Sequence, residues 1–226
     1  MKIKITTGFV VAFIAFRYGL QEAHELVHTA TGRIICGCWG QRDFNVWSLC
    51  PGCYEKNTYA IAATFAGPLF TYIAIWTGVY FMRERNSPRQ KVFGFAMIFA
   101  NNPFARIFTA SMGKGDEIFG LRQILHNSSL AWLAGLSIVL LFTIYPLYKA
   151  FTIIENRNRV GYFIAFLLAG IILDVLILFA IMNPLLKHGV LNNYWILGSP
   201  VLVTLFTFIM LVVFIISAKH ITKAAD

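Results

Sequence analysis

The residues with the clearest chemical role are His24, Glu25 and His28, which form the pattern H-E-x-x-H within an apolar segment. In a helix, positions i and i+4 share a face, so the two imidazoles can bind one metal ion together. This spacing is typical of zinc hydrolases, where the metal lowers the pKa of a water molecule and the carboxylate accepts its proton. The alternative is a helix with two hydrogen-bonded histidines. In lipid-like surroundings ionisable residues are costly and usually functional, which favours the Zn²⁺ site.

The composition indicates a membrane protein. Of the 226 residues, 58% are hydrophobic and only 13% are charged, and the mean hydropathy is +0.68. A soluble domain carries about 25% charged residues. We therefore expect an all-α fold with a single polytopic membrane domain over residues 1–226. The net charge of +9 falls in short loops between apolar segments, which argues against a nucleic-acid partner.

Six apolar segments are each near the roughly 20 residues that cross a bilayer core. The expected spans are residues 5–30, 58–82, 92–112, 130–153, 160–182 and 200–218, with a cysteine-containing loop at 31–57. We expect Thr31-Gly32 to end the first span and Asn183-Pro184 to end the fifth. The first span is expected to stay uncleaved, because no small-x-small site follows it.

Lysine and arginine predict the orientation. With the N-terminus inside, eleven of the 19 lysines and arginines lie in inner segments, six lie in outer loops, and Arg17 and Arg106 lie within spans. The bias predicts an integral protein of the plasma (inner) membrane with both termini in the cytoplasm. It also places the H-E-x-x-H motif, Gly67-Pro68 and Asp116 near one membrane depth, toward the outer face.

A catalytic zinc ion usually has three protein ligands, and the H-E-x-x-H motif supplies two. The remaining candidates are Asp116, Glu117, His126, Asp174 and the cysteines. Asp116 is favoured by its expected depth and by neighbouring glycines that let the backbone bend toward a metal. Acidic residues also favour the first turn of a helix, so the Asp116-Glu117 pair can instead begin one.

Three stretches together resemble the intramembrane zinc metalloproteases of the site-2 protease class. They are EAHELVH at 22–28, FAGPLF at 65–70, and NNPFAR at 101–106 running on to Asp116. The similarity covers the first half of the chain, to about residue 120. In this chain Gly-Asp-Glu replaces the common Asp-Gly, so Glu117 stays open as the third ligand.

The resemblance implies roles for single residues. It makes His24, His28 and Asp116 the Zn²⁺ ligands and Glu25 the base. Asn102 becomes a candidate for substrate binding. Gly67 and Pro68 would lie near the site, where a small residue lets a substrate strand approach.

All four cysteines, Cys36, Cys38, Cys50 and Cys53, lie in the loop after the first span. They can form a second zinc site in a reducing compartment or two disulfides in an oxidising one. The expected outer location favours disulfides that stiffen the loop over the metal site. Trp39, Phe44 and Trp47 of the same loop are expected to act as aromatic anchors at the membrane interface.

Asp174 lies alone in a strongly apolar run. A charge there is costly, so Asp174 is expected either to face the bundle interior, where it can pair with Arg17 or Arg106, or to be protonated.

The sequence thus predicts a membrane-embedded zinc metalloprotease that cleaves a membrane-protein or peptide substrate within or near the lipid bilayer. Three alternatives remain open. They are a metallohydrolase for a lipid or small amide, a non-enzymatic metal transporter or binding protein, and a thiol–disulfide protein built on Cys50 and Cys53.

Overall fold

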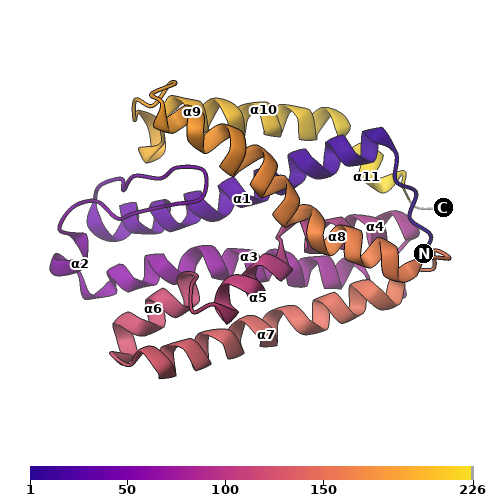
Figure 1. Ribbon diagram of the computed structural model, residues 1–226, viewed down its shortest axis with the longest axis horizontal. Coiled ribbons are helices and arrows are strands. Elements are labelled where there is room, and N and C mark those ends of the chain that lie inside the picture. Colours follow the sequence, from indigo (N-terminus) through magenta and orange to yellow (C-terminus); the bar gives the residue numbers. More distant parts are fainter. Residues whose placement is uncertain (225–226) are drawn as a thin grey trace.

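The computed structural model describes residues 1–224, and these form helices and loops with two isolated β-bridges (Figure 1). The expected all-α fold is therefore confirmed. In chain order the elements are α1 (Thr7–Cys36), α2 (Cys53–Lys56), η1 (Thr58–Ala60), α3 (Ile61–Phe81), α4 (Pro88–Ala100), α5 (Pro103–Ser111), α6 (Asp116–Leu125), α7 (Ser128–Ile153), α8 (Arg159–Leu173), η2 (Asp174–Met182), α9 (Asn183–Lys187), η3 (Ile196–Gly198), α10 (Val201–Ser217) and α11 (Lys219–Thr222).

Three helical stretches in the described chain are long and apolar enough to cross a membrane, against the six that were expected. They are Thr58–Phe81, Ser128–Ile153 and the continuous run Arg159–Lys187, which match the second, fourth and fifth expected spans. The sixth matches α10, which is apolar but has only 17 residues. The first expected span is a long helix, but it carries the polar motif. The third expected span is broken into two helices.

Helix α1 is longer than expected. Its first turn is capped by the Thr6 side chain, which accepts a hydrogen bond from the Phe9 amide. The helix passes through Thr31-Gly32, where an end was expected, and stops at Gly37 with φ 77°. Gly32 does not break the helix because it is buried where the Leu49 side chain packs against it. Tertiary packing overrides the weak helix propensity of glycine here.

The expected third span is two helices. Helix α4 ends at Ala100, Asn102 takes a left-handed conformation with φ 50°, and α5 begins with Pro103. The break follows from proline, which lacks an N–H and restricts the residue before it. Broken backbone inside a membrane protein is tolerated only where it is buried or lines a cavity. The Asn101-Asn102 turn meets that condition, because it lines the cavity described below.

Asn183-Pro184 does not end the fifth span. Helix α8 widens into the π-helical segment η2, and the Asn183 N–H donates to the carbonyl of Leu178, five residues earlier. Pro184 then follows directly after the π-helical turns, and the helix continues to Lys187.

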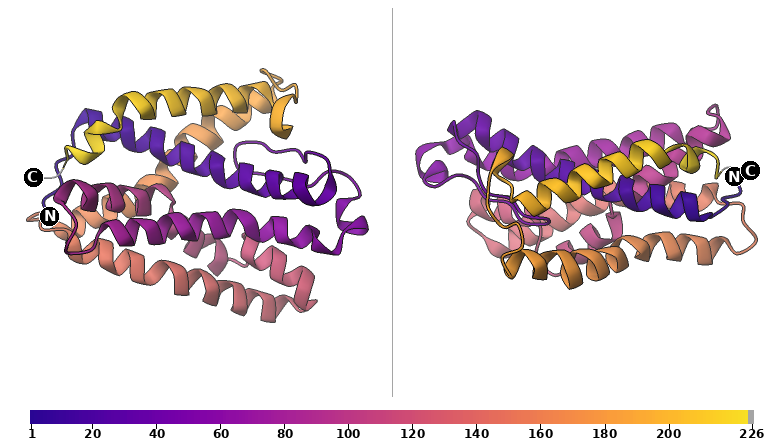
Figure 2. Two further views of the ribbon diagram at one scale, coloured as in Figure 1. Left: turned by 180° about the vertical axis from the view of Figure 1, so that it is seen from behind. Right: turned by 90° about the horizontal axis from the view of Figure 1, so that it is seen from above.

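The half of the bundle that holds both ends of the described chain has an aromatic core. Phe9 and Phe13 of α1, Phe95 of α4 and Phe166 of α8 are buried there. The two ends of the described chain lie together at this end of the molecule, where the Lys4 amide donates to the Ala224 carbonyl at 2.9 Å (Figure 2). The loop that follows α1 lies at the opposite end of the molecule, with α6 (Figure 1).

Candidate metal centre

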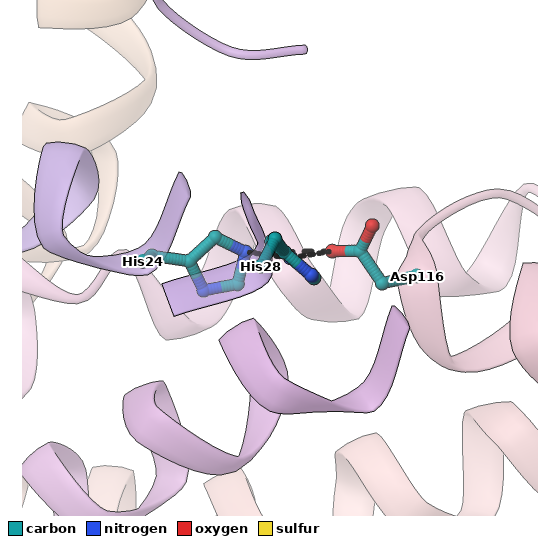
Figure 3. Close-up of side chains that lie close together, drawn as sticks. All are labelled: His24, His28 and Asp116. Atoms are coloured by element: carbon teal, nitrogen blue, oxygen red, sulfur yellow. Dashed lines mark hydrogen bonds and ion pairs between the residues drawn. The ribbon is translucent and has the colours of Figure 1, made fainter. Parts of the chain in front are cut away.

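The structure brings His24, His28 and Asp116 together. The two histidines lie one turn apart on α1, and Asp116 is the first residue of α6 (Figure 3). The His24 and His28 Nε2 atoms are 3.1 Å apart, and they lie 3.4 and 3.6 Å from the Asp116 Oδ2 atom. His28 is fully buried and His24 nearly so.

These three distances suit a tetrahedral metal. Zinc bonds to nitrogen and oxygen are about 2.0–2.2 Å long, so neighbouring ligand atoms around tetrahedral zinc are about 3.3–3.5 Å apart. The observed separations of 3.1–3.6 Å bracket that edge length. Two imidazoles and a carboxylate are also a donor set that a catalytic zinc uses, with a fourth position left for water or substrate.

Helix α3 orients both imidazoles through their other ring nitrogens. The His28 Nδ1–H donates to the Ala63 carbonyl at 2.7 Å, and His24 Nδ1 lies 2.8 Å from the Thr71 hydroxyl. A donor at Nδ1 leaves the Nε2 lone pair of His28 free and directed at the cluster. Such partners fix the tautomer and ring orientation of metal-binding histidines.

Gly67 lies where α3 approaches the site. A Cβ atom on Gly67 would overlap the His28 imidazole, so only glycine lets α3 come this close to α1. Pro68 follows it in the interior of α3 and is also buried. The structure therefore places both residues beside the candidate metal ligands. It also gives Gly67 a packing role that is separate from the expected approach of a substrate strand.

Trp47 covers the ligands, and its expected role as an interface anchor is wrong. Its ring stacks on His28 with centroids 4.2 Å apart and planes 9° apart, and its Nε1–H donates to Asp116 Oδ1 at 3.2 Å. Phe44 is not an interface anchor either, because it is fully buried against Phe206. Trp39 remains partly exposed. The loop turns these rings inward because it folds back along α1 (Figure 1).

Two disulfides and a buried ion pair hold this covering loop, residues 37–52. Cys36 pairs with Cys53, and Cys38 pairs with Cys50. Arg42 of the loop donates to Glu22 of α1 at 2.7 Å, and both side chains are buried. The loop is therefore fixed across the metal centre.

Glu25 is buried next to His24 and lines the cavity at the site. It is 7% exposed, and its Oε2 atom has no hydrogen-bond partner among the described residues. It lines a cavity of about 200 Å³ together with His24 and Asp116. A buried carboxylate oxygen without a partner is costly unless a ligand or water satisfies it. The orphaned oxygen therefore points to a polar molecule in the cavity.

Glu117, the alternative third ligand, points elsewhere. It accepts hydrogen bonds from Arg106 at 2.6 Å and from the Tyr72 hydroxyl, and it is buried. The other guanidinium nitrogen of Arg106 lies 3.1–3.2 Å from both ring nitrogens of His24. A position equally near both nitrogens lies beside the ring and off the in-plane lone pair of Nε2. Arg106 thus lines the cavity without replacing a ligand.

Asp174 pairs with Arg17, one of its two expected partners. Asp174 opens η2, and Arg17 lies on α1 about two turns before His24, on the side of the helix that lines the same cavity. Asn102 donates its side-chain amide to Asp174 at 3.2 Å. Asn102 therefore reaches the cavity, as a substrate-binding role requires, while its amide nitrogen is already engaged. Asp174 and His126 lie outside the metal cluster.

Sequence reasoning missed Thr71, the Ala63 carbonyl and the covering position of Trp47. Thr71 lies four residues after Gly67, so the two residues share a helical face. This spacing could have predicted that Thr71 lies near the site. The sequence does not predict that Trp47 covers the site, because its position depends on how the loop folds back.

Comparisons with protein-family models, with curated proteins and with solved structures give no match to this chain. The functional argument therefore depends on the geometry of the site.

Proposed function

We propose that this protein is a membrane-embedded zinc-dependent peptidase, with His24, His28 and Asp116 as ligands and Glu25 as the general base. The observation that carries the proposal is the ligand triangle with sides of 3.1, 3.4 and 3.6 Å beside a carboxylate oxygen that has no protein partner. The donor set suits zinc, and the histidines already have partners on α3.

A zinc ion bound here would supply a Lewis acid that lowers the pKa of water. Glu25 would accept a proton from the attacking water and return it to the amine that leaves when the C–N bond breaks. Arg106 would stabilise the negative charge that develops on the amide oxygen. Glu117 and the ring of Tyr72 hold its guanidinium in place for that role.

A peptide is favoured over a small amide by the space around the ligands. A second cavity of about 530 Å³ lies between the covering loop and α6, and Asp116 lines both cavities. A helical substrate hides its carbonyls and must be unwound before hydrolysis. An extended segment could occupy both cavities and pass Asp116 between them.

The disulfides support an orientation for the protein. Disulfides persist in oxidising compartments, so the loop at 37–52 is proposed to face outward and both termini to face the cytoplasm. This agrees with the excess of lysine and arginine in the segments at the opposite end.

Metal content tests the site first. The protein is purified in detergent, and zinc per chain is measured for the wild type and for His28→Ala. About one zinc in the wild type and none in the variant supports the site. A thiol assay on the same samples should find no free cysteine. Equal zinc in both proteins, or zinc held with free thiols, would move the metal to the cysteine loop and overturn the assignment.

Activity tests the reaction. The wild type and Glu25→Gln are assayed on a library of soluble and transmembrane peptides beside a lipid extract. We expect peptide cleavage by the wild type and a loss of more than a hundredfold in Glu25→Gln, with its zinc retained. Cleavage of lipid alone would indicate the lipid hydrolase. Full peptidase activity in Glu25→Gln would remove Glu25 as the base.

A further inference from the structure

A separate basic and aromatic cavity lies at the end of the molecule away from the metal centre. It has a volume of about 510 Å³ and lies between the last turns of α3, the turn that follows, and the last turns of α7. Its cations are Arg83, Arg85 and Lys149, and its one anion is Glu84. None of the three cations forms an ion pair within residues 1–224. The cavity therefore carries a net positive charge that the protein leaves uncompensated.

Aromatic residues build the walls of this cavity and hold its cations. The Arg83 guanidinium lies 4.6 Å from the Tyr80 ring centroid, and Arg85 donates to the Tyr80 hydroxyl at 3.4 Å. Trp76 stacks on Tyr145, which ties α3 to α7. Tyrosine and tryptophan favour the depth at which lipid headgroups meet the hydrocarbon. The walls therefore suit a ligand that lies at that depth.

An apolar stripe runs from the cavity along each helix. On α3, Leu69 and Ile73 are 60% and 59% exposed and precede Trp76 and Tyr80 at spacings of a single helical face. On α7, Leu141 is 70% exposed and lies one turn before Tyr145. A free phosphate ion would contact only the cations. A phospholipid would contact the cations through its headgroup and the apolar stripes through its acyl chains.

We propose that this cavity binds the headgroup of an anionic phospholipid, with Arg83, Arg85 and Lys149 around the phosphate and the acyl chains along the stripes of α3 and α7. Basic pockets between membrane helices are suited to such headgroups because each nearby cation contributes to the attraction. The proposal does not depend on the metal centre or its chemistry.

Lipid binding is tested by native mass spectrometry of the full chain in detergent, titrated with phosphatidylglycerol and with phosphatidylcholine of the same acyl chains. The test variant is Arg83→Gln with Lys149→Gln. The matched control is Arg89→Gln with Lys91→Gln, which removes the same charge from the start of α4, outside the cavity. All four positions lie near the surface, so both variants are expected to melt as the wild type does.

The wild type should retain phosphatidylglycerol at least tenfold more tightly than phosphatidylcholine. The test variant should lose about tenfold or more of that affinity, and the control less than threefold. Equal retention of the two lipids in the wild type would overturn the proposal. So would an equal loss in the control variant, which would indicate general charge attraction. Displacement of the lipid by millimolar inorganic phosphate would reassign the cavity to a free anion.

Discussion

The two halves of α1 meet opposite surroundings. The first half packs Phe9, Phe13 and Phe16 into an aromatic core with rings from α4, α8 and α10. The second half buries Glu22, His24 and His28 against partners from α3, α6 and the covering loop, and it buries Glu25 beside the cavity. Apolar packing depends on volume, whereas each buried polar group needs a specific partner. Substitutions in the first half should therefore cost stability, and those in the second should also cost metal.

The largest effect on stability is expected in the aromatic core. The Phe166 ring lies 4.9–5.8 Å from the rings of Phe9, Phe13, Phe95 and Phe99. Phe166→Ala leaves a cavity among them and should lower the free energy of unfolding by about 3–5 kcal/mol. Unfolding is followed by titration with sodium dodecyl sulfate in mixed micelles.

The zinc content of Phe166→Ala should stay at one per chain if the two halves of α1 act separately. Phe208 of α10 is 63% exposed, and its replacement by Ala is the matched control. It should cost less than about 1 kcal/mol. Loss of zinc in Phe166→Ala at temperatures where it stays folded would contradict the separation.

Two glycines of α3 sharpen the comparison. A Cβ on Gly67 meets the His28 ring, and a Cβ on Gly78 meets the Gly94 carbonyl oxygen at 2.7 Å. Each change to Ala should destabilise the protein by about 1–3 kcal/mol through overpacking. Only Gly67→Ala should also weaken zinc binding, because its clash displaces a ligand. Zinc affinities are measured by competition with a chelator, and equal affinities in the two variants would contradict the expectation that the clash displaces a zinc ligand.

Trp47 tests how far the covering loop supports the site. Trp47→Leu removes the stack on His28 and the hydrogen bond to Asp116. Loss of a partner that orients a ligand typically lowers metal affinity 10- to 100-fold, or about 1.4–2.7 kcal/mol. Trp39→Leu in the same loop is the control, because Trp39 lies outside both cavities that Asp116 lines, and it should change the affinity less than threefold. The same chelator competition decides between these outcomes.

The smallest effect on stability is expected where Tyr194 contacts the covering loop. The Tyr194 hydroxyl donates to Asp43 at 2.8 Å, and burial together with the Asp43 carboxylate raises the pKa of Tyr194 to about 12. The folded loop favours the neutral phenol. The hydrogen bond from Tyr194 to Asp43 therefore contributes fully to stability below the ordinary tyrosine pKa of about 10, and this contribution is lost as the pH rises toward 12.

Tyr194→Phe should cost less than about 1 kcal/mol at pH 8. The difference in melting temperature between the wild type and the variant should shrink between pH 10 and 12. A difference that stays constant over this range would mean that the hydroxyl does not hold the loop.

The bounds of the helices show which parts of the fold can be predicted from the sequence alone. The apolar stretches at Thr58–Phe81 and Ser128–Ile153 have the expected bounds to within about two residues, because length and hydropathy decide them. The break at Asn102 and the continuation through Pro184 were missed. Proline has opposite effects in these two places. The difference depends on what each helix packs against and on the π-helical turns before Pro184.

Within the candidate site, the sequence alone determined the pair His24 and His28 and the position of Glu25 beside them, because helical spacing is local. It left the third ligand open between Asp116 and Glu117, which are adjacent in the chain. The tertiary structure separated them, because the turn that opens α6 directs Asp116 toward the histidines and Glu117 toward Arg106. It also turned Trp47 inward through the fold of the covering loop. Local spacing determines which side chains share a helix face, and only the packing of distant segments decides what that face meets.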